Sequence, residues 1–245
     1  MEKCELRKDY STEAKDYDQK RFEGEKGEFL SRTDNAIIRE LTRITNTSLC
    51  LDMPVGSGRV STYLRDEPIN IIGCDYTKEM LSVTKQRSDA NGQIVVQADA
   101  AKLPFKSNSL ELIICLNFFH LFPAPFRGIF SAELDRVIKP GGFLLCSFTN
   151  GWYGGGLSWM RKSLSDLKVI KKVLGDCSIY FLTRGEISKL FPTWRVCKSR
   201  GNYLPFQRLT AHLGRNIERT AQWLTARTPL KRFCFARFYL LRKPE

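Results

Sequence analysis

The sequence contains only two histidines, and its eight cysteines include no CxxC pair. Protein zinc sites are built mostly from histidine and cysteine clusters, so we expect no metal site. Half of the cysteines lie inside apolar runs typical of buried strands: Cys50, Cys74, Cys115 and Cys146. This placement predicts reduced thiols in a hydrophobic core.

Long apolar runs are also missing. No stretch approaches the roughly 18 consecutive apolar residues of a membrane-spanning helix, and residues 1–10 carry charges of both signs. We therefore predict neither a transmembrane helix nor a signal peptide, and we expect a cytoplasmic location. The length of 245 residues and the hydrophobic fraction of 42% are typical of one globular domain.

Acidic residues are scarce at the C-terminal end. The formal net charge is +13, and residues 195–245 hold twelve Lys or Arg against two Glu. Within them, residues 204–224 have the pattern of a basic amphipathic helix, with Leu209, Leu213 and Ile217 near one face. This face either completes the core or rests on an anionic membrane, and nucleic acid stays open as a partner of the basic surface.

Strand and helix patterns alternate from residue 48 onward. Seven short apolar runs are typical of strands: 48–53, 69–75, 92–99, 109–117, 142–149, 195–203 and 232–241. Helical patterns separate the first five, which favours parallel pairing with helices on both faces. We predict an α/β fold, a Rossmann-like, doubly wound, mostly parallel seven-stranded sheet with an antiparallel C-terminal strand.

A glycine-rich turn, Gly56-Ser57-Gly58, follows the first predicted strand in "LCLDMPVGSGRV". Glycines at this place bring free backbone amides close to a bound nucleotide. The dinucleotide fingerprint needs a third glycine or alanine three residues after Gly58, where this chain has Ser61. Asp52 lies next to the turn, where its carboxylate would repel a pyrophosphate. The turn therefore favours a positively charged nucleoside over a nicotinamide or flavin cofactor.

Asp75 ends the second predicted strand, seventeen residues after Gly58, where a carboxylate can accept both hydroxyls of a ribose. Its segment "GCDYTKEML", with "LDMPVGSGR", "QADAAKLPFKSNSLELIICLNFFHLF" and "ELDRVIKPGGFLL", resembles class I S-adenosylmethionine-dependent methyltransferases over about residues 49–148. The most similar group includes ubiquinone and menaquinone methyltransferases. Glu111 replaces the usual Asp of the fourth strand, and "MPVGSG" replaces a commoner "GCGTG".

The resemblance implies S-adenosylmethionine as the cofactor and assigns residues to its parts. Asp52, Gly56 and Gly58 would surround the methionine part. Arg21, in a segment similar to arms that fold over the cofactor, would meet the methionine carboxylate, unless this arm is simply solvated. Asp75 would hold the ribose hydroxyls.

The adenine and the sulfonium are assigned in the same way. Tyr76 would lie beside the adenine, and Asp99 and Ala100 would meet its edge through a carboxylate and a backbone amide. Leu116 and Asn117, at the end of the fourth strand, would lie under the sulfonium.

The acceptor side is less defined. His120 follows the fourth strand and is the candidate base for a hydroxyl acceptor, or else a residue that shapes the pocket. Trp152, Tyr153, Trp159 and Tyr180 lie in or beside a predicted insertion, where they would suit an apolar or ring-bearing acceptor or would only pack the insertion.

We therefore predict an enzyme that transfers a methyl group to a small-molecule or lipid-linked acceptor, with oxygen slightly preferred as the accepting atom. Two alternatives stay open, an RNA methyltransferase that uses the basic surface and a non-catalytic binding module. We expect residues 1–245 to form one methyltransferase domain with four parts: an N-terminal arm or lid (1–32), a cofactor-binding core (33–150), a substrate-side insertion (151–182), and C-terminal helices and strands (183–245).

Overall fold

The computed structural model describes residues 10–88, 93–150, 180, 182–202, 220 and 228–245. Its strands are β1 (Leu49–Asp52), β2 (Asn70–Asp75), β3 (Ile94–Gln97), β4 (Leu110–Cys115), β5 (Ile138–Thr149), β6 (Arg195–Asn202) and β7 (Ala236–Arg242). Its α-helices are α1 (Tyr17–Phe22), α2 (Gly24–Thr45), α3 (Arg59–Tyr63), α4 (Lys78–Ser88), α5 (Ala124–Val137) and α8 (Arg184–Leu190). Two short 3-10 helices are η1 (Phe119–Leu121) and η3 (Pro229–Phe233).

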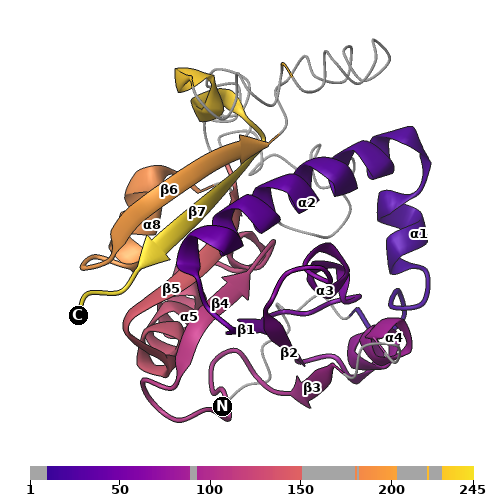
Figure 1. The fold of residues 1–245 in the computed structure, drawn as a ribbon, viewed down its shortest axis with the longest axis horizontal. Coiled ribbons are helices and arrows are strands. Elements are labelled where there is room, and N and C mark those ends of the chain that lie inside the picture. The colour runs from indigo at the N-terminus through magenta and orange to yellow at the C-terminus, as the bar shows by residue number, and fades with distance from the viewer. Residues whose placement is uncertain (1–9, 89–92, 151–179, 181, 203–219, 221–227) are drawn as a thin grey trace.

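The strands form one seven-stranded sheet in the order β3-β2-β1-β4-β5-β7-β6 (Figure 1). The first five strands of this order pair in parallel. β7 runs antiparallel to both of its neighbours, β5 and β6. The predicted fold class, a mostly parallel Rossmann-like sheet with an antiparallel C-terminal strand, is confirmed.

Strand side chains alternate between two hydrophobic layers, because successive residues of a strand point to opposite faces. On one face, Leu41 of α2 and the apolar residues of α3 belong to the same buried cluster as Ile114 of β4. On the other face, Leu134 of α5 and Ile187 of α8 share a cluster with Ile113 of β4. The central strands are therefore buried on both faces, which explains why the sequence shows them as continuous apolar runs.

The start of α2 differs from the prediction. The polar composition of residues 1–30 indicated an arm or lid too polar for a core helix or strand. The spacing of the apolar residues 37, 38, 41 and 44 predicts a helix from Thr33. In the structure α2 begins at Gly24, and Phe29 within it is buried, with 3% of its surface exposed. The charged residues of this segment surround an apolar stripe, so its overall composition did not indicate a buried helix. The predicted boundary between residues 32 and 33 falls inside α2.

Other elements also have different bounds. α5 begins at Ala124, eight residues before the segment "AELDRVIKPGG" whose pattern predicts a helix, and β5 begins at Ile138, four residues before the predicted strand 142–149. The predicted final strand begins only at Ala236, because η3 precedes it. The predicted insertion and the predicted helix 204–224 lie outside the described residues, apart from residues 180, 182 and 220. No helix in the described part of the chain is long and apolar enough to cross a membrane.

Polar contacts tie α2 to the edge strand β6. The side-chain amide of Asn202 donates to Asp34 Oδ1 at 2.7 Å, and Arg200 Nε donates to Glu40 Oε2 at 2.8 Å. Burial raises the pKa of Asp34 to about 6, although Arg59 and the hydrogen bond from Asn202 act to lower it. The amide of Asn202 therefore compensates a partly desolvated carboxyl group.

We expect Asn202→Ala to lower the free energy of unfolding by about 1–3 kcal/mol, because the variant leaves the Asp34 carboxyl without its amide donor. Denaturant titration followed by circular dichroism measures this loss. Asn70→Ala is the matched control, since Asn70 is exposed and its amide lies 3.4 Å from the Ser48 carbonyl oxygen. Equal losses in the two variants would contradict the role given to Asn202.

Candidate active site

The carboxyl ends of β1, β2 and β4 meet where the strand order changes direction. From β1 the chain builds β2 and β3 towards one edge, and then β4 and β5 towards the other. Ligands of open α/β sheets bind outside the carboxyl ends of the strands at such a switch point. Asp52 ends β1, Asp75 ends β2, and Leu116 and Asn117 directly follow β4 (Figure 1). The structure thus brings these four predicted residues to one region.

The glycine turn is fastened to the end of β2. Gly56 N donates to Asp75 Oδ2 at 3.0 Å. The φ angles of Gly56 and Gly58 are +54° and +76°, in the left-handed region that favours glycine. A Cβ at Gly56 would meet no atom within 4 Å, whereas a Cβ at Gly58 would lie 3.1 Å from Thr84 Cγ2 of α4. Gly56 therefore borders open space, and Gly58 allows the close approach of α4.

Asp52 and Asp75 place two carboxyl groups in a poorly solvated region. Asp52 is 1% exposed, and its Oδ2 has no hydrogen-bond partner among the described residues. Asp75 is 8% exposed, and its oxygens accept the backbone N–H groups of Gly56 and Thr77 at 3.0 and 2.9 Å. Burial raises the pKa of both carboxyl groups, and the charge of Asp75 raises the pKa of Asp52 further. A cationic ligand would lower the electrostatic cost of both.

Helix α1 packs on the glycine turn. Ser57 Oγ donates to Asp18 Oδ1 at 2.6 Å, and Arg87 of α4 forms an ion pair with the same carboxylate. The guanidinium carbon of Arg59 lies 3.2 Å from the centroid of the Phe22 ring. Sequence reasoning missed Asp18 and Phe22 because their partners are distant in the chain and no local motif marks them.

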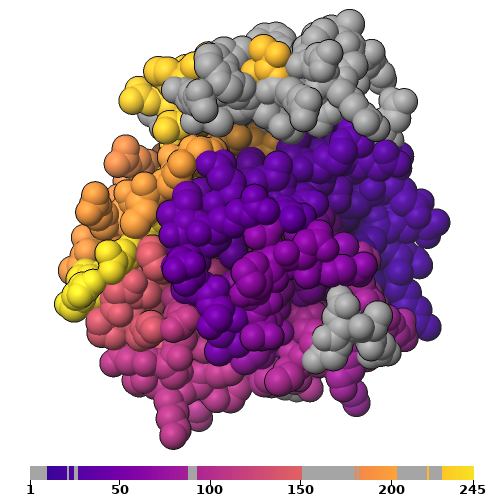
Figure 2. All heavy atoms as spheres, in the orientation of Figure 1, coloured from indigo at the N-terminus to yellow at the C-terminus, as the bar shows by residue number. Residues whose placement is uncertain are grey.

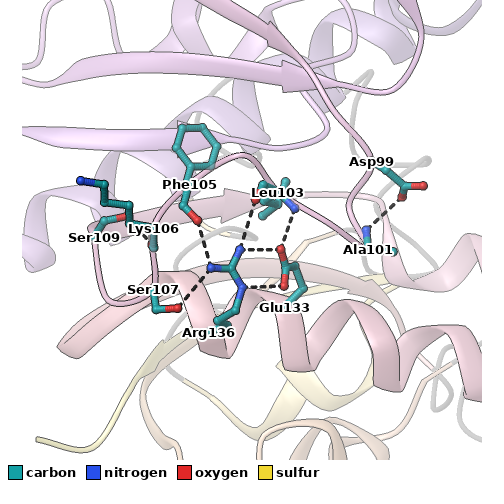
Figure 3. A network of polar contacts seen from close by, with 9 residues as sticks. All are labelled: Asp99, Ala101, Leu103, Phe105, Lys106, Ser107, Ser109, Glu133 and Arg136. Atoms are coloured by element: carbon teal, nitrogen blue, oxygen red, sulfur yellow. Dashed lines mark hydrogen bonds and ion pairs between the residues drawn. The ribbon is translucent and has the colours of Figure 1, made fainter.

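The loop between β3 and β4 is held by two charged residues of α5 (Figure 3). The Arg136 guanidinium donates to the carbonyl oxygens of Leu103 and Phe105 at 3.1 and 3.0 Å. Glu133 accepts the Leu103 N–H at 2.6 Å and forms an ion pair with Arg136 at 2.7 Å. The two sequence motifs "LPF" and "ELDR" therefore bind each other, and together they fix the loop.

The residues assigned to adenine lie where this loop begins and where β2 ends. β2 and β3 end side by side, so Tyr76 and Asp99 follow adjacent strand ends. Gln97 Nε2 donates to the Tyr76 carbonyl oxygen at 3.1 Å, and Asp99 Oδ1 accepts the Ala101 N–H at 2.9 Å. The Tyr76 side chain is 58% exposed, while Ala100 packs against the core. The exposed ring of Tyr76 is accessible to a ligand.

The segment after β4 brings His120 and Tyr180 together. Asn117 has a φ of +54°, and its N–H donates to Ser147 Oγ of β5 at 2.9 Å. His120 lies in η1, is 9% exposed, and accepts the Tyr180 N–H at its carbonyl oxygen at 2.8 Å. Leu116 packs against the hydrophobic layer under α2 and α3. Two of the predicted acceptor residues therefore lie next to each other beyond the end of β4.

Arg127 of α5 is a residue that sequence reasoning missed. It is 6% exposed, and its guanidinium carbon lies 5.5 Å from the centroid of the Tyr180 ring. Its Nε has no partner among the described residues, and burial lowers its pKa, an effect that Glu186 and Tyr180 oppose. The guanidinium of arginine is effectively always charged in proteins. The only sequence signal was a single cation in the apolar segment "PAPFRGIF".

The structure does not describe the side chains of four predicted residues. Trp152, Tyr153 and Trp159 lie outside the described residues. Arg21 lies within α1, but its side chain is also outside the described part of the structure. Their roles stay predictions.

Several known proteins with similar sequences are methyltransferases. Residues 51–146 match the family model described as a methyltransferase domain. The chain is 30% identical over 115 residues to a demethylmenaquinone methyltransferase of Bacillus licheniformis, which covers 45% of this chain and 49% of that protein. It is 31% identical over 97 residues to phthiotriol/phenolphthiotriol dimycocerosates methyltransferase 1 of Mycobacterium ulcerans, with coverages of 39% and 35%. The match thus spans less than half of either relative.

A solved structure shares the fold over most of both chains. Magnesium protoporphyrin IX methyltransferase from Synechocystis, with bound S-adenosylhomocysteine, gives a TM-score of 0.60 at 15% identity and covers 92% of this chain and 86% of that chain. The resemblance to methyltransferases of the menaquinone methyltransferase group is confirmed by the domain match and by these relatives, and the domain match indicates S-adenosylmethionine as the cofactor.

The residues at the switch point fit this cofactor. The buried Oδ2 of Asp52, which has no partner among the described residues, suits a ligand that carries positive charge. The Asp75 carboxyl group at the end of β2 accepts the backbone N–H groups of Gly56 and Thr77, and a carboxylate is the kind of acceptor that ribose hydroxyls need. The open space beside Gly56 admits a ligand close to the backbone.

We expect Arg136→Met to weaken S-adenosylmethionine binding by about 1 kcal/mol, roughly fivefold in Kd, because the loop that carries Asp99 loses its anchor. Isothermal calorimetry measures the affinity, and a thermal melt measures the accompanying loss of stability. Arg65→Met, at an exposed arginine after α3, is the control. An unchanged Kd in a folded Arg136→Met protein would show that the loop does not position the adenine site.

Proposed function

We propose that the protein transfers the methyl group of S-adenosylmethionine to a small-molecule or lipid-linked acceptor. The observation that carries this proposal is the buried carboxyl group of Asp52, which lies with Asp75 beside the glycine turn and has no hydrogen-bond partner for Oδ2 among the described residues. Two carboxyl groups there suit a cationic ligand with free ribose hydroxyls and disfavour a pyrophosphate.

When bound, the cofactor supplies an activated methyl group on a good leaving group. The protein is left with alignment of the acceptor and exclusion of water. Asp52, Gly56 and Gly58 border the methionine part, with Arg21 near its carboxylate, and Asp75 accepts the ribose hydroxyls. The hydrogen bond from Gly56 N to Asp75 Oδ2 supports this assignment, because it fixes the glycine turn and the Asp75 carboxyl group relative to each other.

The other end of the cofactor is assigned to the loop residues. Tyr76, Asp99 and Ala100 bind the adenine, and the anchoring of their loop by α5 supports this role. Leu116 and Asn117 lie under the sulfonium. The hydrogen bond from Asn117 N to Ser147 Oγ fixes the backbone at that place.

The acceptor meets the cofactor beside η1. His120 is the candidate base for a hydroxyl acceptor, and oxygen is the preferred accepting atom. Tyr180, with Trp152, Tyr153 and Trp159, provides aromatic surface. The relatives are named for demethylmenaquinone and for phthiotriol dimycocerosates, which supports an apolar or lipid-linked acceptor.

Calorimetric titration with S-adenosylmethionine, S-adenosylhomocysteine and NADH tests the cofactor. We expect binding of the first two and none of NADH. Asp75→Ala should weaken the binding of S-adenosylmethionine by about 1–3 kcal/mol, because the ribose hydroxyls lose their acceptor. Asp75→Asn keeps an acceptor oxygen, so this variant should lose less binding free energy. Asp66→Asn, at an exposed aspartate, is the control. Failure of the wild-type protein to bind either sulfur nucleoside would refute the proposal.

We also expect the affinity for S-adenosylmethionine to increase with pH. The raised pKa values of Asp52 and Asp75 mean that the free protein retains protons on these groups above the ordinary carboxyl range. A bound cation favours the ionised carboxylates, so binding releases protons, and the affinity increases until the pH passes the raised pKa values.

Calorimetry in buffers of different ionisation enthalpy measures this proton release. Asp52→Asn should flatten the pH dependence, since an amide does not titrate in this range. The same pH dependence in the wild-type protein and in Asp52→Asn would assign the proton release to another group.

A further inference from the structure

Exposed hydrophobic side chains gather in one short segment. Among the described residues, seven large hydrophobic side chains are exposed, and three of them lie within six consecutive positions: Leu230 at 40%, Phe233 at 37% and Phe235 at 38%. The other four are scattered over the fold: Ile44, Tyr76, Ile94 and Ile129. Single exposed apolar residues are ordinary, but a group of them marks an interaction surface.

Basic residues are interleaved with these three side chains. Lys231 and Arg232 lie between Leu230 and Phe233, and Arg232 is exposed. We call these five residues the η3 surface: Leu230, Lys231, Arg232, Phe233 and Phe235.

The charge of the η3 surface is reinforced by its neighbours. Burial lowers the pKa of Lys231, and the charges of Arg237, Arg200, Arg184 and Arg232 lower it further. Of these, Arg200 is paired with Glu40, whereas Arg184 and Arg232 are exposed. The surface therefore carries concentrated positive charge and suits an anionic partner.

The η3 surface is held rigidly. The side-chain amide of Asn150 donates to the carbonyl oxygens of Arg232 and Cys234, both at 2.7 Å, and Asn150 N donates to the Phe235 carbonyl oxygen at 2.8 Å. Cys234 is fully buried, so the chain turns this side chain inward and Phe233 and Phe235 outward. The exposed aromatic rings are a product of local packing, not of a frayed end.

Its place relates the η3 surface to the candidate active site. Asn150 directly follows the carboxyl end of β5, and β7 begins after η3, with Ala236 paired to Thr149. β4 and β5 are parallel, so their carboxyl ends lie on the same side of the sheet. The η3 surface therefore lies on the side of the sheet that carries Asn117. Figure 1 shows η3 in yellow beyond the end of β6 and the start of β7, and Figure 2 shows this segment on the outside of the molecule.

We propose that the η3 surface docks the protein on a bilayer that contains anionic lipids. Leu230, Phe233 and Phe235 enter the headgroup region, and Lys231 and Arg232 meet the lipid phosphates. A nucleic acid would also attract the basic residues, but a phosphate backbone offers no apolar phase, and Leu230 cannot stack on a base. The bilayer is favoured because it uses both kinds of side chain. Docking itself requires no methyl transfer, and only its link to a lipid-borne acceptor rests on the proposed function.

Vesicle sedimentation with the full chain tests this proposal. We expect retention on vesicles of phosphatidylcholine with phosphatidylserine, much weaker retention on phosphatidylcholine alone, and release by salt. Lys231→Glu with Arg232→Glu should lower the partition coefficient by about tenfold or more, because two attractive charges become repulsive. Phe233→Ser with Phe235→Ser should lower it by about tenfold through loss of apolar insertion.

Two matched controls distinguish the η3 surface from net charge and general hydrophobicity. Arg65→Glu with Lys106→Glu makes the same change of charge at exposed positions elsewhere, and Ile94→Ser with Ile129→Ser removes exposed apolar side chains elsewhere. Both should retain nearly wild-type vesicle binding. S-adenosylmethionine calorimetry on every variant reports separately on the candidate active site.

Three outcomes would overturn the proposal. The first is that the wild-type protein does not bind the anionic vesicles. The second is that the η3 variants bind as their controls do, which would assign vesicle binding to another part of the chain. The third is that the charge variant loses binding to polyuridylic acid while vesicles never retain the protein, which would make the η3 surface a nucleic-acid site. Failure of the wild-type protein to bind S-adenosylmethionine would refute the proposed function but would not contradict docking on the bilayer.

Discussion

The hydrogen bond from Gly56 N to Asp75 Oδ2 joins the turn after β1 to the end of β2, and the candidate site depends on it. It requires a carboxylate in a poorly solvated place, close to the more deeply buried Asp52. Burying two carboxyl groups destabilises a folded chain unless donors or opposite charges compensate them. Backbone N–H groups supply part of that compensation at Asp75, whereas Asp52 Oδ2 receives none from the described residues. A cationic ligand would complete the arrangement, so the proposed binding specificity follows from an electrostatic cost already present in the fold.

Long-range contacts then hold this region in shape. Asp18 of α1 receives the Ser57 hydroxyl, and Arg136 of α5 binds the backbone of the loop after Asp99. Both contacts come from helices that pack outside the sheet, so the turn and the loop are fixed from two sides. Because methyl transfer from S-adenosylmethionine depends largely on alignment, such supports would contribute to the proposed activity without touching the reacting atoms.

The sequence predicted the sheet well because central strands covered on both faces are apolar throughout, as in β4, and the site residues that end those strands could be located with them. It failed at α2, where charged residues masked the stripe that includes Phe29, and at η3, whose apolar residues face outward and imitate a strand. It also missed Asp18 and Arg127. These side chains act on elements that are distant in the chain, and their role exists only once the fold has brought them together.

The two sides of the candidate site have different origins in the chain. The proposed cofactor side is built from strand ends and tight turns between residues 52 and 117, where local motifs carry the information. The proposed acceptor side combines η1 with Tyr180 and Arg127, and Asn150 after the end of β5 joins this side of the sheet to the η3 surface. Because β5 is a central, buried strand, a bilayer held at η3 would have a fixed position relative to the end of β4. An acceptor anchored in that bilayer would then approach His120 from a defined direction, and membrane contact would contribute to alignment as well as to affinity.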